Sequence, residues 1–468
     1  MPLILGTNSI KDTGYNVANS LRFNDGSSDY LTRAQSNGNQ DKWTWSVWLK
    51  RSTLGSSQCF FASTDGSATS FDAKFDSSNR IRVYNYFGGG FDADLVTTRV
   101  FRDVSAWYHI LVVYDSGNST EAHRLRIYVN GTEESSFSTT DYPALNADSD
   151  LNVSGSNIEI GRQANGSQFF DGYMAEVVLI DGQALDPTSF GEFDSDSPTI
   201  WKPIDVSGLT FGNNGFYLDF ENSGSLGADV SGNSNNFTVN NLTSIDQSTD
   251  TCTNNFATYN SIFGQGRQDL LTYAEGNLSV TSSHTTGSDT TSTSTFAFDS
   301  GKWYAEFKLT SSADGVYVGV ATSNLNFTNS GIDTSGNSNC WITRGDDGTV
   351  RNNGSTAYFG TSFSNNDIIQ IAIDMDNSKI WWGLNGTYGN SGNPSTGSNP
   401  AYSNLSGELM IIVGDNYSDR TPTILANFGS PPYSISSGNS DGNGYGNFEY
   451  AVPSGYYALN TKNLAEYG

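Results

Sequence analysis

The sequence predicts an all-β protein with two jelly-roll-like antiparallel β-sandwiches in tandem. The chain of 468 residues is 13% aromatic and holds 50 glycines, a composition that favours strands joined by many turns. Apolar and polar residues alternate in stretch after stretch, which is typical of a sheet with one buried face. Asn-Gly and Asp-Gly pairs, which tolerate the positive φ of a tight hairpin, separate these stretches. Together the three observations indicate antiparallel sheets.

The alternation is clearest in the stretches 43–50, 123–131 and 368–376. Every second residue of a strand points to the same side of the sheet. The faces that we expect to be buried consist of Trp43, Trp45, Val47 and Leu49; Leu125, Ile127 and Val129; and Ile369, Ile371, Ile373 and Met375.

Turn-forming residues mark where the predicted strands end. Asn-Gly pairs at 130–131 and 385–386 each follow a strand and predict hairpins. The stretch 279–295 is rich in Thr and Ser, and we expect a hairpin of polar strands there because Thr is a good strand residue. Pro187 can open one helical turn.

Composition divides the chain into four parts. Residues 1–14 are expected to form an N-terminal arm, residues 15–220 a first sandwich and residues 256–468 a second one. Residues 221–255 are rich in Asn, Ser, Thr and Gly, and they are interpreted as a connector that also returns an edge strand to the first sandwich. A core of its own is not expected there, because about 40 residues are too few to close one.

Charge and cysteine usage exclude several functions. The net charge of −26 argues against nucleic acid, because phosphate binding requires Lys and Arg. Cys59, Cys252 and Cys340 are far apart and predict neither a disulfide framework nor a CxxC metal site. We expect no secretory signal and no membrane insertion, because no apolar run approaches about 18 residues.

Ordered motifs resemble two known families. The first half resembles laminin-G or concanavalin-A-like domains in SLRFNDGSSDYL (20–31), WTWSVWLKR (43–51), AWYHILVVYD (106–115), LRIYVNG (125–131) and the stretch 158–187. The second half resembles SPRY domains in GKWYAEFKL (301–309), VYVGVATSNLNF (316–327), the stretch 367–386, TILANFGSPPY (423–433) and FEYAVPSGYYALN (448–460).

The combination of the two domains resembles virion proteins of marine tailed phages, often described as tail-fibre-like. The resemblance implies a non-enzymatic structural protein of the bacteriophage virion, assembled in the host cytoplasm and used in host attachment. Its expected partners are other virion proteins, further copies of itself, with a trimer as the oligomer implied by family analogy, and a glycan or protein of the host surface. A capsid decoration or head-fibre protein is the first alternative, and a glycan-degrading enzyme is the second.

Carbohydrate recognition needs an exposed aromatic ring beside polar groups that bond hydroxyls. In KIWWGLNGTYGN (379–390), Trp382 should pack inside with Ile380. Trp381 should then point outward, near Asn385 and Tyr388, and these three residues are the predicted ligand site. The alternative is that Trp381 packs against the other domain or a neighbouring subunit.

No cofactor is expected, although a structural calcium ion remains an alternative. Calcium takes oxygen ligands from Asp and Asn loops, and Asp229, Asn233 and Asn235 in DVSGNSN could supply them. The competing interpretation is a hydrogen-bonded turn. The RGDDG stretch (344–348) is interpreted as a hairpin turn rather than an adhesion motif.

Catalytic residues are not predicted. Glucanases on such sandwiches use paired carboxylates, and the nearest approach to a pair is Asp374 and Asp376, which we expect to be solvated. The three histidines, His109, His123 and His284, lie near no nucleophile or zinc motif, and His109 is expected to be a satisfied core histidine.

Overall fold

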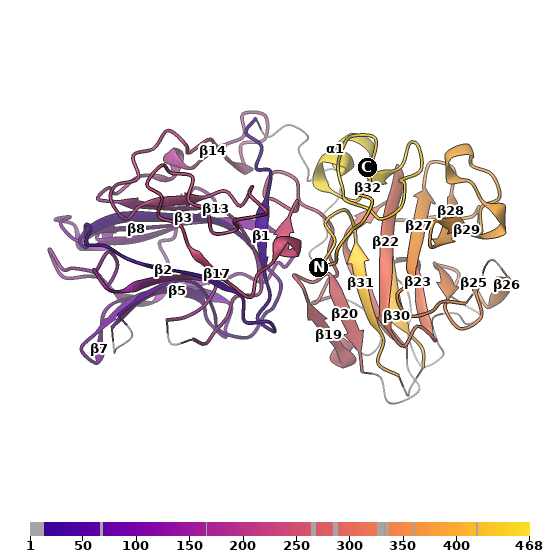
Figure 1. Ribbon diagram of the computed structural model, residues 1–468, viewed down its shortest axis with the longest axis horizontal. Helices are drawn as coiled ribbons and strands as arrows, with labels where there is room; N and C mark the ends of the chain where they lie inside the picture. The colour runs from indigo at the N-terminus through magenta and orange to yellow at the C-terminus, as the bar shows by residue number, and fades with distance from the viewer. Residues whose placement is uncertain are drawn as a thin grey trace. The chain divides into compact units, whose positions relative to one another are not determined.

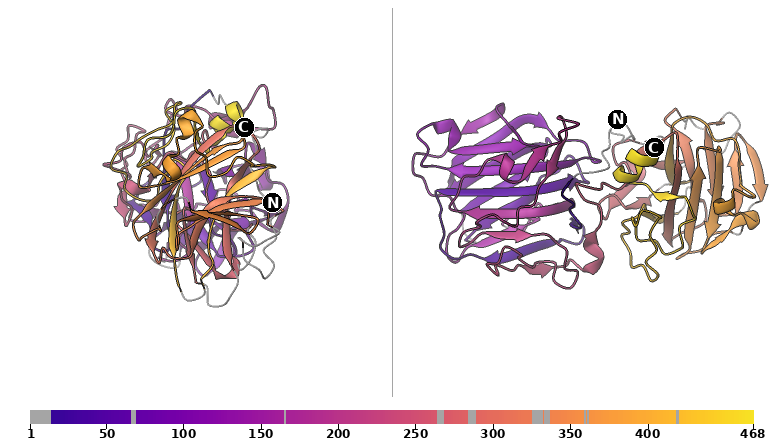
Figure 2. Two further views of the ribbon diagram at one scale, coloured as in Figure 1. Left: turned by 90° about the vertical axis from the view of Figure 1, so that its right-hand side faces the viewer. Right: turned by 90° about the horizontal axis from the view of Figure 1, so that it is seen from above.

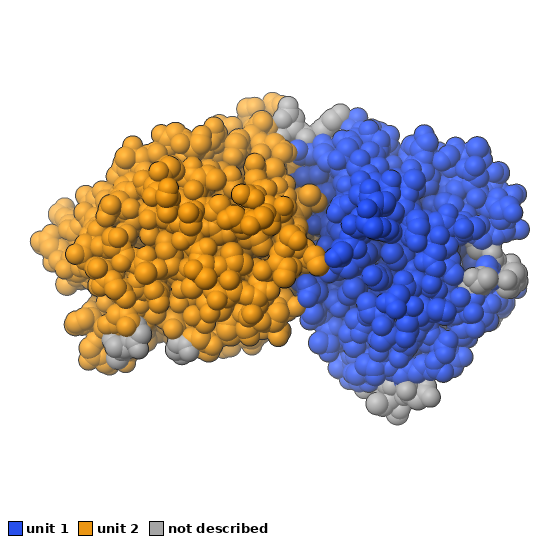
Figure 3. All heavy atoms as spheres, viewed as in Figure 1, with its two compact units in different colours: residues 1–12, 254–468 blue, residues 13–253 orange. Residues whose placement is uncertain are grey.

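The chain divides into two β-sandwich units, one formed by residues 13–253 and the other by residues 254–468 (Figures 1 and 3). The structure, a computed structural model, describes residues 14–65, 69–164, 166–263, 268–283, 289–324, 332, 337–358, 360, 362–417 and 420–468. The predicted N-terminal arm, apart from Gly14, lies outside the described residues, as does His284.

Two eight-stranded sheets form the first unit. Sheet A contains, in spatial order, β10 (Thr132–Glu133), β9 (Leu125–Val129), β8 (Trp107–Asp115), β3 (Lys42–Arg51), β13 (Gly172–Asp181), β1 (Ser20–Phe23) and β18 (Gln247–Ser248), with β16 (Phe216–Leu218) also on β13. Sheet B contains β11 (Phe137–Asp141), β7 (Gly90–Val100), β6 (Arg80–Phe87), β5 (Ser70–Phe75), β4 (Gln58–Thr64), β12 (Asn157–Ile160), β2 (Tyr30–Ala34) and β17 (Thr238–Asn240). A small separate sheet pairs β14 (Gly191–Phe193) with β15 (Trp201–Pro203).

The second unit packs an eight-stranded sheet against a six-stranded one (Figure 2). Sheet C contains β19 (Leu271–Ala274), β20 (Ser279–Ser282), β31 (Thr423–Asn427), β22 (Lys302–Ser311), β27 (Ile368–Asp374), β28 (Lys379–Leu384) and β29 (Thr387–Tyr388), with β32 (Tyr457–Ala458) on β22. Sheet D contains β21 (Thr290–Phe298), β30 (Leu409–Asp415), β23 (Val316–Thr322), β24 (Cys340–Arg344), β25 (Thr349–Asn352) and β26 (Ser355–Tyr358).

Helices are short in the described part of the chain. The α-helix α1 (Thr461–Tyr467) begins at Asn460, whose side chain accepts a hydrogen bond from the N–H of Asn463. The single turn expected at Pro187 is the 3-10 turn η3 (Pro187–Ser189). None of the described helices is long and apolar enough to cross a membrane.

The predicted all-β fold class is confirmed, and so are the buried faces. Trp43, Trp45, Val47 and Leu49 lie in the core between sheets A and B, and the same core holds Leu125, Ile127 and Val129. Ile369, Ile371, Ile373 and Met375 lie in the core between sheets C and D. Burial of these apolar side chains, at about 25 cal/mol for each Å², is the main force that holds each sandwich together.

The expected connector is built into the first unit. Within 221–255, β17 pairs with β2 at one edge of sheet B, and β18 pairs with β1 at one edge of sheet A. The first unit therefore continues to residue 253, beyond the predicted end at residue 220.

The hairpin predicted over 279–295 is wrong. β20 pairs with β19 and β31 in sheet C, whereas β21 pairs with β30 in sheet D. Thr and Ser do form strands there, but strand propensity says nothing about which sheet a strand joins.

Both faces of sheet C are buried. Its outer face carries Tyr304, Ala372 and Trp381, which form a second apolar cluster with Phe448 and Tyr456 of the C-terminal segment. Residues 445–458 of this segment therefore cover an outer face that strand alternation alone would predict to be exposed to solvent.

Candidate functional site

Trp381 and Trp382 point to opposite faces of sheet C, as predicted, but neither is exposed. Trp382 lies in the inter-sheet core with 3% of its surface accessible. Trp381 is 0% exposed, and its indole N–H donates to the carbonyl of Ser398 at 2.9 Å. The prediction that Trp381 is an exposed platform is wrong, because loops of its own unit enclose the ring.

A buried carboxylate holds the C-terminal segment over Trp381. Glu306 accepts hydrogen bonds from the backbone N–H groups of Glu449 and Tyr450 at 2.9 and 2.8 Å. It also accepts from the Tyr304 hydroxyl at 2.8 Å and the Asn427 amide at 3.3 Å. Burial raises the pKa of Glu306, and the two backbone N–H groups oppose that rise.

Asn385 is part of the turn that it begins. It lies at φ 48° and Gly386 at φ 84°, as a two-residue hairpin requires. Its side-chain oxygen accepts from the N–H of Ile368 at 3.0 Å, and its amide donates to Asp367 at 2.7 Å. These bonds occupy hydrogen-bonding groups of the Asn385 side chain that were expected to bind a sugar.

Tyr388, the third predicted ligand residue, is half-buried and packs against the cluster that contains Trp381. Burial raises the pKa of its hydroxyl well above the ordinary value, and the nearby Glu306 carboxylate adds to the rise. The structure therefore brings the three predicted residues to one hairpin, but it presents no exposed ring there.

A cavity of about 200 Å³ lies beside this hairpin, between the open edges of sheets C and D. Its lining residues are Thr343, Gly348, Gly360, Phe363, Trp382, Gly383, Leu384, Asn385, Thr387, Tyr388 and Gly389. The β24–β25 turn supplies one wall and the β28–β29 hairpin the other.

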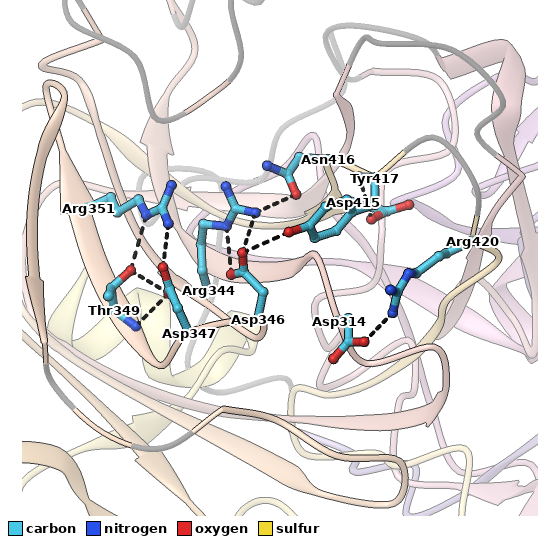
Figure 4. Close-up of polar contacts among 10 residues, drawn as sticks. All are labelled: Asp314, Arg344, Asp346, Asp347, Thr349, Arg351, Asp415, Asn416, Tyr417 and Arg420. Atoms are coloured by element: carbon cyan, nitrogen blue, oxygen red, sulfur yellow. Dashed lines mark hydrogen bonds and ion pairs between the residues drawn. The ribbon is translucent and has the colours of Figure 1, made fainter.

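An exposed aromatic residue, Tyr417, lies near the β24–β25 turn (Figure 4). Tyr417 is 37% exposed as a residue, and its hydroxyl donates to Asp346 at 3.2 Å. The guanidinium groups of Arg344 and Arg420 lie 5.8 and 5.4 Å from the ring centre. Tyr417 is not among the predicted ligand residues, although the polar loop DNYSDR (415–420) between two strands is a sequence signal for a binding loop.

Paired charges surround Tyr417. Arg344 donates to both oxygens of Asp346, at 3.1 and 3.0 Å, and to Asn416 at 2.7 Å. Arg420 pairs with Asp314. The bidentate pair fixes the planes of both groups, so the loops present a preorganised polar surface around a half-exposed ring. We call Arg344, Asp346, Asn416, Tyr417 and Arg420 the Tyr417 surface.

The RGDDG stretch is the predicted hairpin turn. β24 and β25 pair antiparallel on either side of it, with Thr343 opposite Val350. Asp347 accepts from the Arg351 guanidinium at 2.6 Å and from the Thr349 hydroxyl at 2.6 Å, next to the Tyr417 surface (Figure 4).

The carboxylates considered for catalysis have structural partners. Asp374 is 2% exposed, forms an ion pair with Lys302 at 3.0 Å and accepts from Asn377. Asp376 accepts from the N–H of Gly301 at 2.9 Å. The expectation that Asp374 is solvated is wrong, because the carboxylate is 2% exposed and is engaged by Lys302 and Asn377.

His109 is a satisfied core histidine, as expected. Its Nδ1 accepts from the Trp201 indole N–H at 3.1 Å, so Nε2 carries the proton and donates to Ser46 Oγ at 2.8 Å. Burial lowers its pKa to about 3. His123 is exposed in the 3-10 turn η2 (Glu121–His123).

The candidate calcium residues form a hydrogen-bonded loop. Asp229 accepts from the N–H groups of Tyr217 and Asn235 at 2.9 and 2.7 Å. The amides of Asn233 and Asn235 both donate to the carbonyl of Gly215 at 2.9 Å. These bonds match the turn interpretation, and no cluster of three or more His, Cys, Asp or Glu suited to a metal occurs among the described residues.

Each unit contains a stretch that matches the model of a known protein family. Residues 25–189 match the family model of the concanavalin A-like lectin/glucanases superfamily, and residues 302–409 match the model of the SPRY domain. No curated protein is similar enough to the chain to count as a match.

Solved structures resemble single units. The SPRY domain of human HERC1 is 18% identical over 36% of this chain and 96% of its own, with a TM-score of 0.30. A candidate carbohydrate binding protein from Bacteroides ovatus is 17% identical over 48% of this chain and 59% of its own, with a TM-score of 0.33. A heptameric SAP-like pentraxin from Limulus polyphemus is 14% identical over 37% and 80%, with a TM-score of 0.28. The two family matches, over residues 25–189 and 302–409, give the chain an N-terminal concanavalin A-like domain and a C-terminal SPRY domain.

Proposed function

We propose that the protein is a non-enzymatic adhesive component of a bacteriophage virion, a tail fibre or another surface-displayed protein, that binds a host glycan through the Tyr417 surface. The half-exposed Tyr417 ring carries the proposal, because sugar rings pack their C–H faces on exposed aromatic rings. The fixed Arg344–Asp346 pair and Asn416 offer planar polar groups to hydroxyls beside it.

The order of the two domains supports the virion assignment through its resemblance to tail-fibre-like proteins of marine phages. The partners in this proposal are other virion proteins, further copies of the chain and a host surface glycan. Neither a metal nor a cofactor takes part in the binding.

Glycan-array and host-cell retention of the purified chain test the proposal. We expect Tyr417→Ala to weaken retention at least about tenfold, because it removes the ring contact. Tyr417→Phe keeps the ring and should retain most of the binding. Ile262→Ala is the matched control, since Ile262 is an exposed apolar residue of the same unit outside the surface.

Two results would contradict the proposal. Equal retention of Tyr417→Ala and the unchanged chain would show that another surface binds. If the unchanged chain is retained on neither glycans nor cells, the protein is not adhesive. A capsid decoration role would then be tested by finding the chain in many copies of an icosahedral lattice.

A further inference from the structure

The cavity between the edges of sheets C and D differs chemically from the Tyr417 surface. Phe363 and Trp382, which are buried in the inter-sheet core, line the cavity together with half-buried Leu384. No charged side chain is among its lining residues. An ionic group placed there would therefore lose hydration without gaining a partner of opposite charge.

Several polar groups of the lining are already engaged, whereas the buried hydroxyl of Tyr388 has no hydrogen-bond partner among the described residues and leaves the cavity one polar contact. The Thr343 hydroxyl donates to the carbonyl of Thr349 at 3.3 Å, and the Asn385 amide donates to Asp367. The N–H groups of Gly348 and Gly360 donate to the carbonyls of Arg344 and Gly348 at 3.2 and 3.1 Å. A sugar would have to bury hydroxyl groups beside these committed partners, which costs free energy.

Four glycines, Gly348, Gly360, Gly383 and Gly389, lie among the lining residues. Since glycine has no side chain, these parts of the wall are flat backbone. Aromatic rings pair favourably with other rings, as Phe363 and Trp382 permit. Apolar cavities of about 150 Å³ bind benzene, so a cavity of about 200 Å³ has room for a ring of indole size.

We propose that this cavity binds one uncharged aromatic ring of benzene to indole size. The site is separate from the Tyr417 surface, and its ligand belongs to a different chemical class from the glycan proposed above. Free indole is the probe, and isothermal titration calorimetry together with thermal melting of the full chain is the measurement.

We expect saturable indole binding with a rise in melting temperature, weaker binding of benzoate than of benzene because of its charge, and no binding of glucose. Thr343→Ile, which replaces the hydroxyl on the wall with a larger ethyl group, should weaken indole binding at least tenfold. Thr310→Ile is the matched control: Thr310 also lies on a strand of this unit, and its hydroxyl also donates to a threonine carbonyl at 3.3 Å.

Leu384→Ala is a second test that leaves Thr343 unchanged. It should weaken indole binding, because it removes apolar surface from the cavity wall. Tyr417→Ala should leave indole binding unchanged, so failure of the glycan proposal and failure of this one are distinguishable. The inference is overturned if indole does not bind up to its solubility limit, if Thr343→Ile and Thr310→Ile bind it equally, or if glucose binds in its place.

Discussion

Lys50 and Asp250 form a buried ion pair across the first unit, with Lys50 Nζ 2.8 Å from Asp250 Oδ2 and both side chains 1% exposed. The other carboxylate oxygen accepts from the Trp107 indole N–H at 3.1 Å. Lys50 lies near the end of β3, in the middle of sheet A, whereas Asp250 comes two residues after β18. The pair therefore fixes the returning segment to the outer face of sheet A.

Replacing Asp250 by Ala should destabilise the first unit by about 3–5 kcal/mol, because it leaves a buried ammonium group without its carboxylate. The free energy of unfolding in urea measures the loss. Asp115→Ala is the control. It breaks the pair between Lys42 of β3 and Asp115 of β8, in which Lys42 is 43% exposed, and should cost less than about 1 kcal/mol. Equal losses in the two variants would show that burial does not set the strength of these pairs.

Glu306→Ala should loosen the C-terminal segment that covers Trp381. Four donors lose a buried acceptor, and we expect a cost of about 2–4 kcal/mol to the second unit. Hydrogen exchange of residues 448–458 should accelerate, and tryptophan fluorescence should shift to the red as the Trp381 ring becomes wet. Glu408→Ala, at an exposed glutamate, should change neither signal. Unchanged exchange after Glu306→Ala would mean that apolar contacts alone hold the segment.

Strand alternation predicts the inner faces of these sandwiches well, because side-chain direction along a strand follows from local geometry. Trp382, Ile371 and Trp45 are examples, and each is buried as expected. Alternation cannot predict what covers an outer face. Trp381 is covered by Ser398 and Tyr456, and Asp374 pairs with Lys302 of another strand. Strand alternation does not encode such contacts.

The candidate site was predictable only in part. The Asn385 turn was found, because Asn-Gly pairs carry a local conformational signal. Tyr417 was missed, since the exposure of a loop residue depends on how neighbouring loops pack. The same limit explains the polar strands within 279–295, where propensity indicates strands but not their partners.

The two Asn-Gly turns share one hydrogen-bond arrangement. Asn130 donates its N–H to the carbonyl of His109 at 2.9 Å, and its side chain accepts from the His109 N–H at 2.8 Å. Asn385 makes the same two bonds with Ile368, both at 3.0 Å. Both asparagines have positive φ, 49° and 48°.

Asn130→Ala and Asn385→Ala should therefore each cost about 1–3 kcal/mol, from the lost hydrogen bond and the strained φ. Asn→Gly at either position keeps the φ and should cost less. Hydrogen exchange of the hairpins 125–134 and 379–388 measures the effect in each unit. If Ala and Gly variants are equally unstable, the φ contributes nothing and only the hydrogen bond matters.

Glu176 is a buried acid in a bulge of β13, with φ 51° and 5% exposure. The Tyr217 hydroxyl donates to it at 2.7 Å, and the Tyr15 hydroxyl at 3.5 Å. Burial raises the pKa of Glu176 to about 7, the bond from Tyr217 opposes the rise, and the nearby charge of Asp219 adds to it.

A carboxyl group whose pKa is higher in the folded than in the unfolded state binds its proton more tightly when folded. The contribution of Glu176 to the free energy of unfolding should thus be largest at or below about pH 4.5. It should fall by up to about 3 kcal/mol as the pH rises from there through about 7. Urea unfolding at pH 5 and pH 8 measures the difference. Glu176→Gln cannot ionise, so it should abolish this share of the pH dependence while keeping an acceptor for Tyr217. If Glu176→Gln retains the full loss between pH 5 and pH 8, other groups cause it.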